Sequence, residues 1–322
     1  MANMLESFHI MVEPQEGGSY DDLLKLARKT ESLGFAGWFR SDHIHTMNVP
    51  VTNDSTDCWT TLAGLARDTR RIRLGTMVSP MTLRHPSEFA KIVATVDQMS
   101  GGRIEVGIGA GWFEKEHTAF GIALPSPGGR ADRLAESLEV CTRLWADGSA
   151  SYSGKLFQLH DAPGYPKPAQ RPHPPIILGG AGKRRTPELA ARFADEFNVF
   201  GGDVGVFVER RARVQRACER LGRDPASIRF SWAGPTVVGA DRRDLERRSQ
   251  RRLDYNGQSD EVGGWIESMR SHGMFVGTVD DVASQIAALE QAGCVRWYFQ
   301  LVPLDDDGML KLIVEDLIPR IR

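Results

Sequence analysis

Apolar positions along the chain alternate between short continuous runs and longer stretches with helical spacing. The clearest case involves residues 71–78 and 103–112, two runs typical of buried strands. Between them, residues 86–99 place four apolar side chains on one helical face: Phe89, Ile92, Val93 and Val96. A strand, a helix and a second strand in this order predict a parallel pair joined by a crossover.

The same alternation predicts eight strands along the whole chain. They cover residues 8–12, 35–41, 71–78, 103–112, 175–178, 197–200, 228–238 and 295–302. Helices follow each strand, at residues 23–33, 57–66, 86–99, 130–145, 186–194, 205–221, 279–292 and 309–318. Eight such units predict an α/β fold, the (β/α)8 TIM barrel, because a doubly wound open sheet usually has fewer strands and carries its glycine fingerprint after the first.

We expect one domain over residues 1–322, with insertions near 110–130, 149–175 and 241–276. The second insertion has the pattern of a hairpin. The third is predicted to be mostly helical and charged. Its stretch from Arg242 to Arg252 interleaves basic residues with Asp244, Glu246 and leucines, which favours a solvated amphipathic helix over a polyanion-binding patch.

Composition and charge argue against several classes of partner and site. A net charge of -2 argues against nucleic acid or an anionic membrane as the main partner. The four cysteines are scattered without a C-x-x-C, so neither zinc nor disulfides are indicated and reduced core thiols are expected. The amino terminus lacks a signal-peptide pattern and no window reaches eighteen apolar residues, so we expect a cytoplasmic protein acting on a small molecule.

Three glycines end the fourth predicted strand, in the run Gly107-Ile108-Gly109-Ala110-Gly111. The spacing is G-x-G-x-G and the position is the fourth strand, so this is not a Rossmann signature. Missing side chains would let something flat approach the backbone. The alternative is that the glycines only make a tight turn and allow close packing.

A second glycine run joins the fifth strand to a helix, in Gly179-Gly180-Ala181-Gly182-Lys183-Arg184-Arg185-Thr186. Free backbone N–H groups at a helix N-terminus beside three cations suit a phosphate. In TIM barrels phosphate loops more often follow strands seven and eight. A plain turn with solvated cations is the alternative.

Candidate chemistry lies after the second strand, where Asp42 and His43 are followed by His45. A histidine beside a carboxylate at a barrel mouth is an acid or base candidate, although a lone histidine is often structural. No third ligand has metal-site spacing, so no metal is predicted. Glu114, Glu116 and His117 are interpreted as surface residues, with His117 a reserve acid or base.

Hydrolytic machinery is not indicated, because the chain has no G-x-S-x-G elbow and no cysteine with a persuasive histidine partner. Glycines, an aromatic residue and an anion loop at the strand ends suit a large, planar, phosphorylated cofactor instead.

With these motifs the chain resembles the bacterial luciferase-like oxidoreductases, and within them the branch that uses the deazaflavin coenzyme F420. The motifs occur in order over nearly the whole length: Ser41-Asp42-His43, Leu74-Gly75-Thr76-Met77-Val78, Gly107 to His117, Lys167 to Pro172 and Ile177-Leu178-Gly179-Gly180. The FMN-dependent branch shares the barrel and most of these motifs.

The resemblance implies an insertion-bearing TIM barrel, often a homodimer, with the coenzyme ring across the mouth. Asp42 would then bond the polar edge of the ring, and His43 would sit near the reacting carbon and be catalytic. A non-prolyl cis peptide at Met77-Val78, after Thr76, would support the ring. The lining residues would be Gly109, Ala110, Gly111 and Trp112, and the phosphate would be held by Gly179, Gly180, Ala181, Gly182 and Lys183.

One departure concerns Trp112, which stands where related F420-dependent sugar-phosphate dehydrogenases have a catalytic glutamate. This argues against sugar-phosphate oxidation. The leading hypothesis is hydride transfer between F420 and a small organic substrate. An FMN-dependent monooxygenase and a non-catalytic flavin-binding protein are the alternatives.

Substrate choice is expected to depend on three variable segments, residues 44–56, 118–129 and 251–274. Trp59, Trp112 and Trp232 are candidate pocket walls, with core packing expected for at least one of them.

Overall fold

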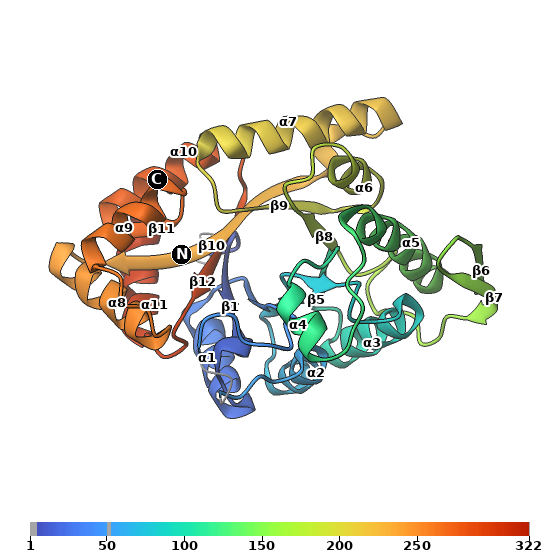
Figure 1. The fold of residues 1–322 in the computed structure, drawn as a ribbon, viewed down its shortest axis with the longest axis horizontal. Coiled ribbons are helices and arrows are strands. Elements are labelled where there is room, and N and C mark those ends of the chain that lie inside the picture. The colour runs from blue at the N-terminus through green and yellow to red at the C-terminus, as the bar shows by residue number, and fades with distance from the viewer. Residues whose placement is uncertain (1–4, 50–52, 322) are drawn as a thin grey trace.

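A closed barrel of parallel strands forms the centre of the protein in this computed structural model, which describes residues 5–49 and 53–321. Eight strands pair side by side around the barrel in the order β1, β2, β3, β5, β8, β9, β10 and β12, and β12 pairs with β1 to close it. Figure 1 shows the helices surrounding these strands. The predicted (β/α)8 barrel is confirmed.

All eight predicted barrel strands are present, and the second, third, fourth and eighth are shorter than predicted. They are β1 (Phe8–Val12), β2 (Gly37–Arg40), β3 (Arg73–Thr76), β5 (Ile104–Gly109), β8 (Ile176–Gly179), β9 (Glu196–Phe200), β10 (Arg229–Gly239) and β12 (Arg296–Leu301). A two-residue strand, β4 (Ser79–Pro80), pairs with the end of β5. The Met77-Val78 peptide between β3 and β4 is cis, as the resemblance implied.

The helices between the strands follow the predicted periodicity. They are α1 (Tyr20–Leu33), α2 (Cys58–Asp68), α3 (Pro86–Ser100), α5 (Pro127–Trp145), α6 (Arg185–Phe193), α7 (Val204–Leu221) and α10 (Val279–Gln291). Local chemistry explains their ends: Ser19 and Asp22 form a capping box on α1, which ends at Gly34 with a left-handed φ of 89°. Asp57 caps α2 by accepting a hydrogen bond of 2.8 Å from Thr60 N.

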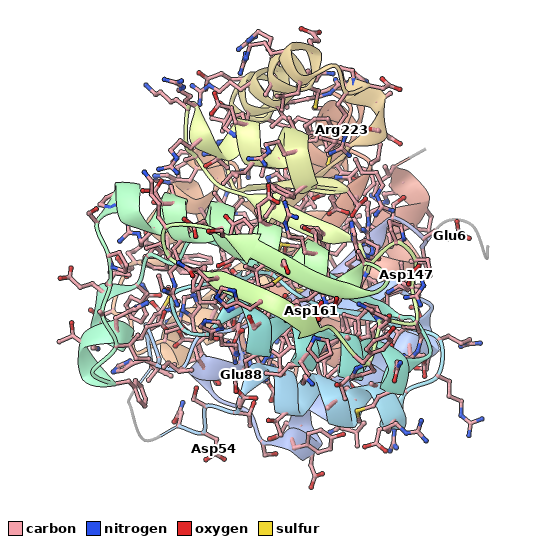
Figure 2. All side chains as sticks on the ribbon, turned by 90° about the vertical axis from the view of Figure 1, so that its right-hand side faces the viewer. Glu6, Asp54, Glu88, Asp147, Asp161 and Arg223 are labelled. Carbon is pink, nitrogen blue, oxygen red and sulfur yellow. The ribbon has the colours of Figure 1, made fainter. Side chains whose placement is uncertain are left out.

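The predicted hairpin insertion is present as β6 (Ser149–Ser153) and β7 (Gln158–Pro163), which are antiparallel. Figure 2 shows it on the outside of the molecule, with Asp161 on β7 and Asp147 shortly before β6. Near residues 110–130 the chain forms a short helix, α4 (Glu114–Ala119), which lies in front of the strands in Figure 1.

The third insertion differs from its prediction at its end. It contains α8 (Arg242–Tyr255) and α9 (Val262–Ser271), as the mostly helical prediction implied, but it ends in a strand, β11 (Phe275–Thr278), that was not predicted. β11 pairs with the second half of β10, which at 11 residues is long enough to extend beyond its barrel neighbours. The predicted C-terminal helix over residues 309–318 is divided into three consecutive pieces. These are α11 (Asp307–Leu312), a π-helical turn (Ile313–Leu317) and α12 (Ile318–Arg320).

The main apolar core lies between the strands and the surrounding helices. Outward strand residues such as Ile10, Trp38, Leu74 and Val106 have no exposed surface. All four cysteines are buried in this layer, which fits core thiols. Trp59 and Trp232 are also buried, so both are core residues, and Trp232 stacks on Phe275 at 3.7 Å.

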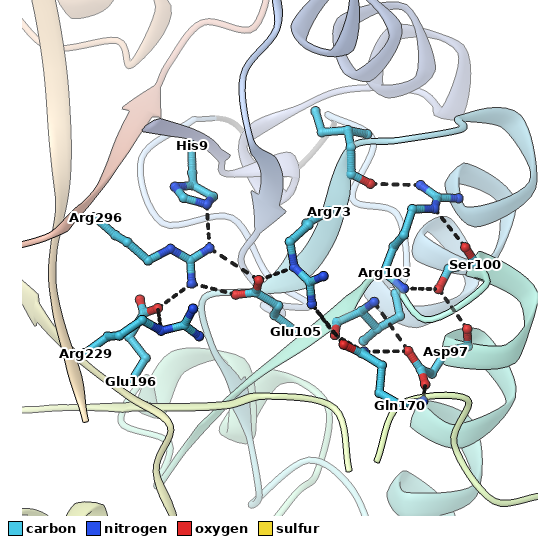
Figure 3. Close-up of polar contacts among 12 residues, drawn as sticks. His9, Arg73, Asp97, Ser100, Arg103, Glu105, Gln170, Glu196, Arg229 and Arg296 are labelled. Carbon is cyan, nitrogen blue, oxygen red and sulfur yellow. Dashed lines mark hydrogen bonds and ion pairs between the residues drawn. The ribbon is translucent and has the colours of Figure 1, made fainter. Parts of the chain in front are cut away.

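The inside of the barrel contains a charged layer near the amino ends of the strands. Arg296 donates to Glu105 Oε2 at 2.8 Å and also contacts Glu196, while Arg73 bonds Glu105 from the other side (Figure 3). Burial alone would raise the pKa of Glu105, but Arg296 and Arg73 lower it to about 2. Above this layer, Met11, Phe39, Met77, Ile177 and Tyr298 form a small apolar cluster. These two layers fill the interior of the barrel, so we expect a ligand at its carboxyl-terminal mouth.

Among the helices within the described ranges, none combines the length and apolar character needed to cross a bilayer.

Candidate active site

The mouth of the barrel is formed by the segments that follow the carboxyl ends of the strands. Because all eight barrel strands are parallel, the residues after β2, β3, β5 and β8 meet at one rim. Every residue of the predicted site either ends one of these four strands or follows it. The anion loop after β8 therefore lies on the same rim as His43, not on the opposite one.

His43 forms an ion pair with a buried carboxylate at this rim. Its Nδ1 lies 3.1 Å from both oxygens of Glu116, whose side chain has no exposed surface. Glu116 Oε2 also accepts a hydrogen bond of 3.2 Å from Ile44 N. Burial alone would lower the pKa of His43, but the hydrogen bond and charge of Glu116 outweigh burial and raise it. The imidazolium form is thus favoured.

The other ring nitrogen of His43 is oriented differently. Within residues 5–49 and 53–321, no side chain or backbone group hydrogen-bonds Nε2. The ring is 14% exposed and makes edge contacts with Trp112 and Phe113 at 5.9 and 5.8 Å. With Nδ1 fixed by Glu116, Nε2 is the atom that can give or take a proton.

Glu116 and His117 are not surface residues, so their interpretation from the sequence was wrong. α4 turns back over the rim and buries both side chains. His117 Nε2 lies 2.8 Å from Thr82 Oγ1 and Nδ1 lies 2.7 Å from the Phe113 carbonyl. Since both of its ring nitrogens are engaged, His117 fixes local structure and is a poor acid or base.

Asp42 is buried beside His43 and is held by the segment after β3. Its Oδ2 accepts hydrogen bonds of 2.6 Å from Ser79 Oγ and from Arg84 Nη1. Ser79 in turn accepts from Trp59 Nε1 at 3.0 Å. Asp42 Oδ1 is buried with no hydrogen-bond partner in the described part of the chain. A contact from Asp42 to a ring remains a prediction, and Oδ1 is the atom that could make it.

The glycines of β5 are required by the protein itself. A Cβ on Gly107 would lie 2.1 Å from the Thr76 carbonyl oxygen, and one on Gly109 would lie 2.6 Å from a Val78 methyl. Gly111 has a φ of 79°, and its Cβ would meet Thr82 Oγ1 at 2.3 Å. Close packing against the segment after β3, the alternative left open above, therefore explains these glycines. Ligand contact by Gly109, Ala110 and Gly111 stays a prediction.

The loop after β8 is exposed at Gly180 to Arg184, and it leads into a helix whose first turn no described side chain caps. Asp57, His85, Ser126 and Asp203, by contrast, cap α2, α3, α5 and α7. Gly180 has a φ of 129°. Open N–H groups beside Lys183 fit an anion, and phosphate binding here remains a prediction.

A further polar group at the mouth was missed. Glu13 directly follows β1 and is bonded by the amides of Gln15 and Gln300, while Ser41 donates to Gln15 Oε1 at 2.5 Å. Its position right after a strand was the available signal, the same one that identified Asp42. His45, Trp112 and Phe113 border a surface cavity of about 700 Å³ beside this rim. Trp112 is 61% exposed, so it can wall a pocket.

Comparison with known proteins gives a consistent family. The family model described as "Luciferase-like monooxygenase" matches residues 3–296. An uncharacterised Mycobacterium tuberculosis protein, Rv0953c, is 33% identical over 195 residues, covering 56% of this chain and 68% of its own length. An F420-dependent glucose-6-phosphate dehydrogenase of Microbacterium testaceum is 31% identical over 195 residues, covering 59% and 56%.

A solved structure, the monooxygenase RslO1 of Streptomyces bottropensis, superposes with a TM-score of 0.81. It covers 98% of this chain and 100% of that chain at 23% identity. This likeness concerns the fold.

Proposed function

Because the chain belongs to the luciferase-like monooxygenase family, we propose that it is an oxidoreductase that uses coenzyme F420 to exchange a hydride with a small organic substrate. Relatives and structural neighbours of this family include F420-dependent enzymes and monooxygenases. Membership of the family makes the protein an oxidoreductase or monooxygenase-like enzyme, and the choice of F420 as its coenzyme is our inference.

The residues at the mouth fit a planar, phosphorylated coenzyme. Asp42 Oδ1 is a buried acceptor that no group in the described ranges satisfies, and the N–H edge of a ring could donate to it. Lys183 and the uncapped start of α6 offer a positive site for a phosphate on the same rim. Thr76, Met77, Val78 and the end of β5 would line the bound ring. The bound coenzyme would supply the hydride chemistry.

The single observation that carries the proposal is the His43–Glu116 pair. Glu116 holds Nδ1 and raises the pKa of the ring, so Nε2 can donate a proton to a substrate oxygen that gains charge on reduction, or accept it in the reverse direction. Trp112 and Phe113, packed against the ring edge, would limit the access of water to this proton. We therefore assign His43 as the catalytic residue.

Incubation with each coenzyme tests the proposal. The protein should retain F420 through gel filtration and change its absorbance at the deazaflavin band when a suitable substrate is added. The alternative is an FMN-dependent monooxygenase, and the family's description as luciferase-like monooxygenases is consistent with it. Retention of FMN with no retention of F420 would establish it in place of our proposal.

The non-catalytic alternative predicts a different result. A flavin-binding protein without activity would bind a coenzyme tightly and turn over no donor or acceptor from a broad panel. Replacing His43 would then change neither property.

We further propose that the protein is a single domain and a homodimer located in the cytoplasm. Analytical ultracentrifugation of the purified chain tests the oligomeric state.

A further inference from the structure

Two arginines on α8 are buried, although the sequence predicted a solvated amphipathic helix whose basic residues face the solvent. Arg248 and Arg252 are 9% and 8% exposed. Arg248 is neutralised, because it lies 2.8 Å from Asp244 and also contacts Asp306. Arg252 differs: no carboxylate within the described ranges lies within 4.0 Å of its guanidinium, and its Nη1 is buried without an acceptor.

Glu13 and Glu16 are the carboxylates whose charge acts on Arg252. Both carboxylates already accept hydrogen bonds from other groups. The oxygens of Glu13 accept from the Gln15 and Gln300 amides. Those of Glu16 accept from the backbone N–H groups of residues 47, 48 and 49 at 3.0, 3.1 and 3.0 Å. The guanidinium therefore has negative charge nearby but no hydrogen-bonded carboxylate among the described residues.

An arginine in this position remains charged. Burial lowers the pKa of Arg252 to about 10, which leaves it protonated at neutral pH. A buried charge without a hydrogen-bonded counter-ion is costly to the fold. The planar guanidinium fork matches a carboxylate, which it can bind through two parallel hydrogen bonds. An anionic ligand would supply the missing partner.

Glu13 acts electrostatically on both Arg252 and His43. Its charge raises the pKa of His43 as well as acting on Arg252. Glu13 follows β1, His43 follows β2, and Arg252 belongs to the helix after β10, whose strand is separated from β1 only by β12. In the barrel order, the strand before Glu13 thus lies between the strand before His43 and the strand before Arg252, and the charge of Glu13 acts on both residues. The anion loop after β8 lies away from Arg252, beyond β9 and β10.

We propose that Arg252 is a substrate-binding residue and that the substrate of this enzyme carries a carboxylate. The inference rests on the proposed function, in which His43 exchanges a proton with the reacting part of the substrate. The carboxylate is held by the guanidinium and is unchanged by the reaction. It orients the carbon that exchanges the hydride.

Carboxylate binding can be measured on the protein without coenzyme. The probes are sodium benzoate and sodium pyruvate, with benzamide as a neutral analogue and inorganic phosphate as a second anion, at constant ionic strength. The variant is Arg252→Gln. The matched control is Arg251→Gln, because Arg251 is the adjacent residue and pairs with Asp305 at 2.6 Å on another face of the helix.

At least one carboxylate should raise the Tm of the wild type and of Arg251→Gln, while benzamide should not. Arg252→Gln should bind that carboxylate about ten- to a hundred-fold more weakly, as loss of a charged hydrogen-bond partner implies. A wild type that responds to no carboxylate, an equal response to benzamide, or an unchanged Arg252→Gln would overturn the proposal. A response to phosphate alone would also overturn it.

A stability measurement separates a binding role from a structural one. Arg252→Met retains the stem and removes the unpaired charge, so its Tm without ligand should equal or exceed that of the wild type. Arg248→Met, which strands two carboxylates, should melt lower. A lower Tm for Arg252→Met would contradict the proposal, because it would show that the guanidinium stabilises the fold.

The source of the anion is tested by titrating F420. If Arg252→Gln weakens F420 binding as much as carboxylate binding, the anion belongs to the coenzyme and the substrate assignment is wrong. Failure of the wild type to bind any flavin or deazaflavin would instead refute the proposed function, and that result needs none of these variants.

Discussion

Replacing Glu116 by Gln is the sharpest test of the His43 ion pair. The carboxylate has no exposed surface and holds both His43 Nδ1, at 3.1 Å, and Ile44 N, at 3.2 Å. Gln keeps one oxygen that can serve Ile44 but lacks the charge. Because a hydrogen bond to a charged group contributes about 1.5–3 kcal/mol, the free energy of unfolding should fall by about 2 kcal/mol at pH 6.

The loss should depend on pH with a definite sign. The pKa of His43 is raised in the folded protein by Glu116, so the pair stabilises fully below the ordinary imidazole value of 6.5. This stabilisation disappears as pH rises through the raised pKa. At pH 9 the wild type and Glu116→Gln should differ only by a neutral hydrogen bond, about 1 kcal/mol or less.

Urea unfolding between pH 5.5 and 9 measures this difference. Glu114→Gln is the matched control, since Glu114 lies on the same short helix and is exposed; it should leave the pH dependence unchanged. An equal loss for Glu116→Gln at every pH, or no loss at pH 6, would refute the ion pair as the source of the raised pKa.

Three further outcomes follow from the site. His43→Ala should lower turnover by about 10²–10⁴-fold and weaken coenzyme binding far less, as steady-state kinetics and a fluorescence titration will show. Lys183→Gln should weaken F420 binding only about two- to five-fold, because an exposed lysine contributes little to an ion pair. It should leave the binding of a deazaflavin without phosphate unchanged, because that molecule lacks the group that Lys183 would bind. Gly111→Ala should lower the free energy of unfolding by about 1–3 kcal/mol, owing to its φ of 79° and the contact with Thr82, whereas Gly128→Ala, which meets no atom within 4 Å, should not destabilise.

The barrel could be predicted because each strand is a short buried run and each helix has a matching apolar face. Each barrel strand has buried outward-facing residues within its own short run, as Ile10, Trp38, Leu74 and Val106 illustrate for four strands. A pattern that lies within one element is visible in the sequence. β11 was missed because its pairing with β10 depends on how far β10 extends beyond the barrel.

Contacts between distant segments explain the other errors. Glu116 was taken for a surface residue because nothing near it in the sequence shows that α4 turns back to meet His43, 73 positions earlier. The β5 glycines were open to two explanations, since the neighbours that need them, Thr76, Val78 and Thr82, lie on another segment. The burial of Arg252 likewise depends on elements far from α8. Spacing reveals the faces of one element, but not what another element places against them.

A crystal structure with F420 bound tests the central claim most directly. The account predicts the deazaflavin ring at the carboxyl-terminal mouth, with its reacting face beside His43 Nε2 and its phosphate against Gly179 to Lys183. A ring bound elsewhere, or a phosphate held away from the start of α6, would contradict it.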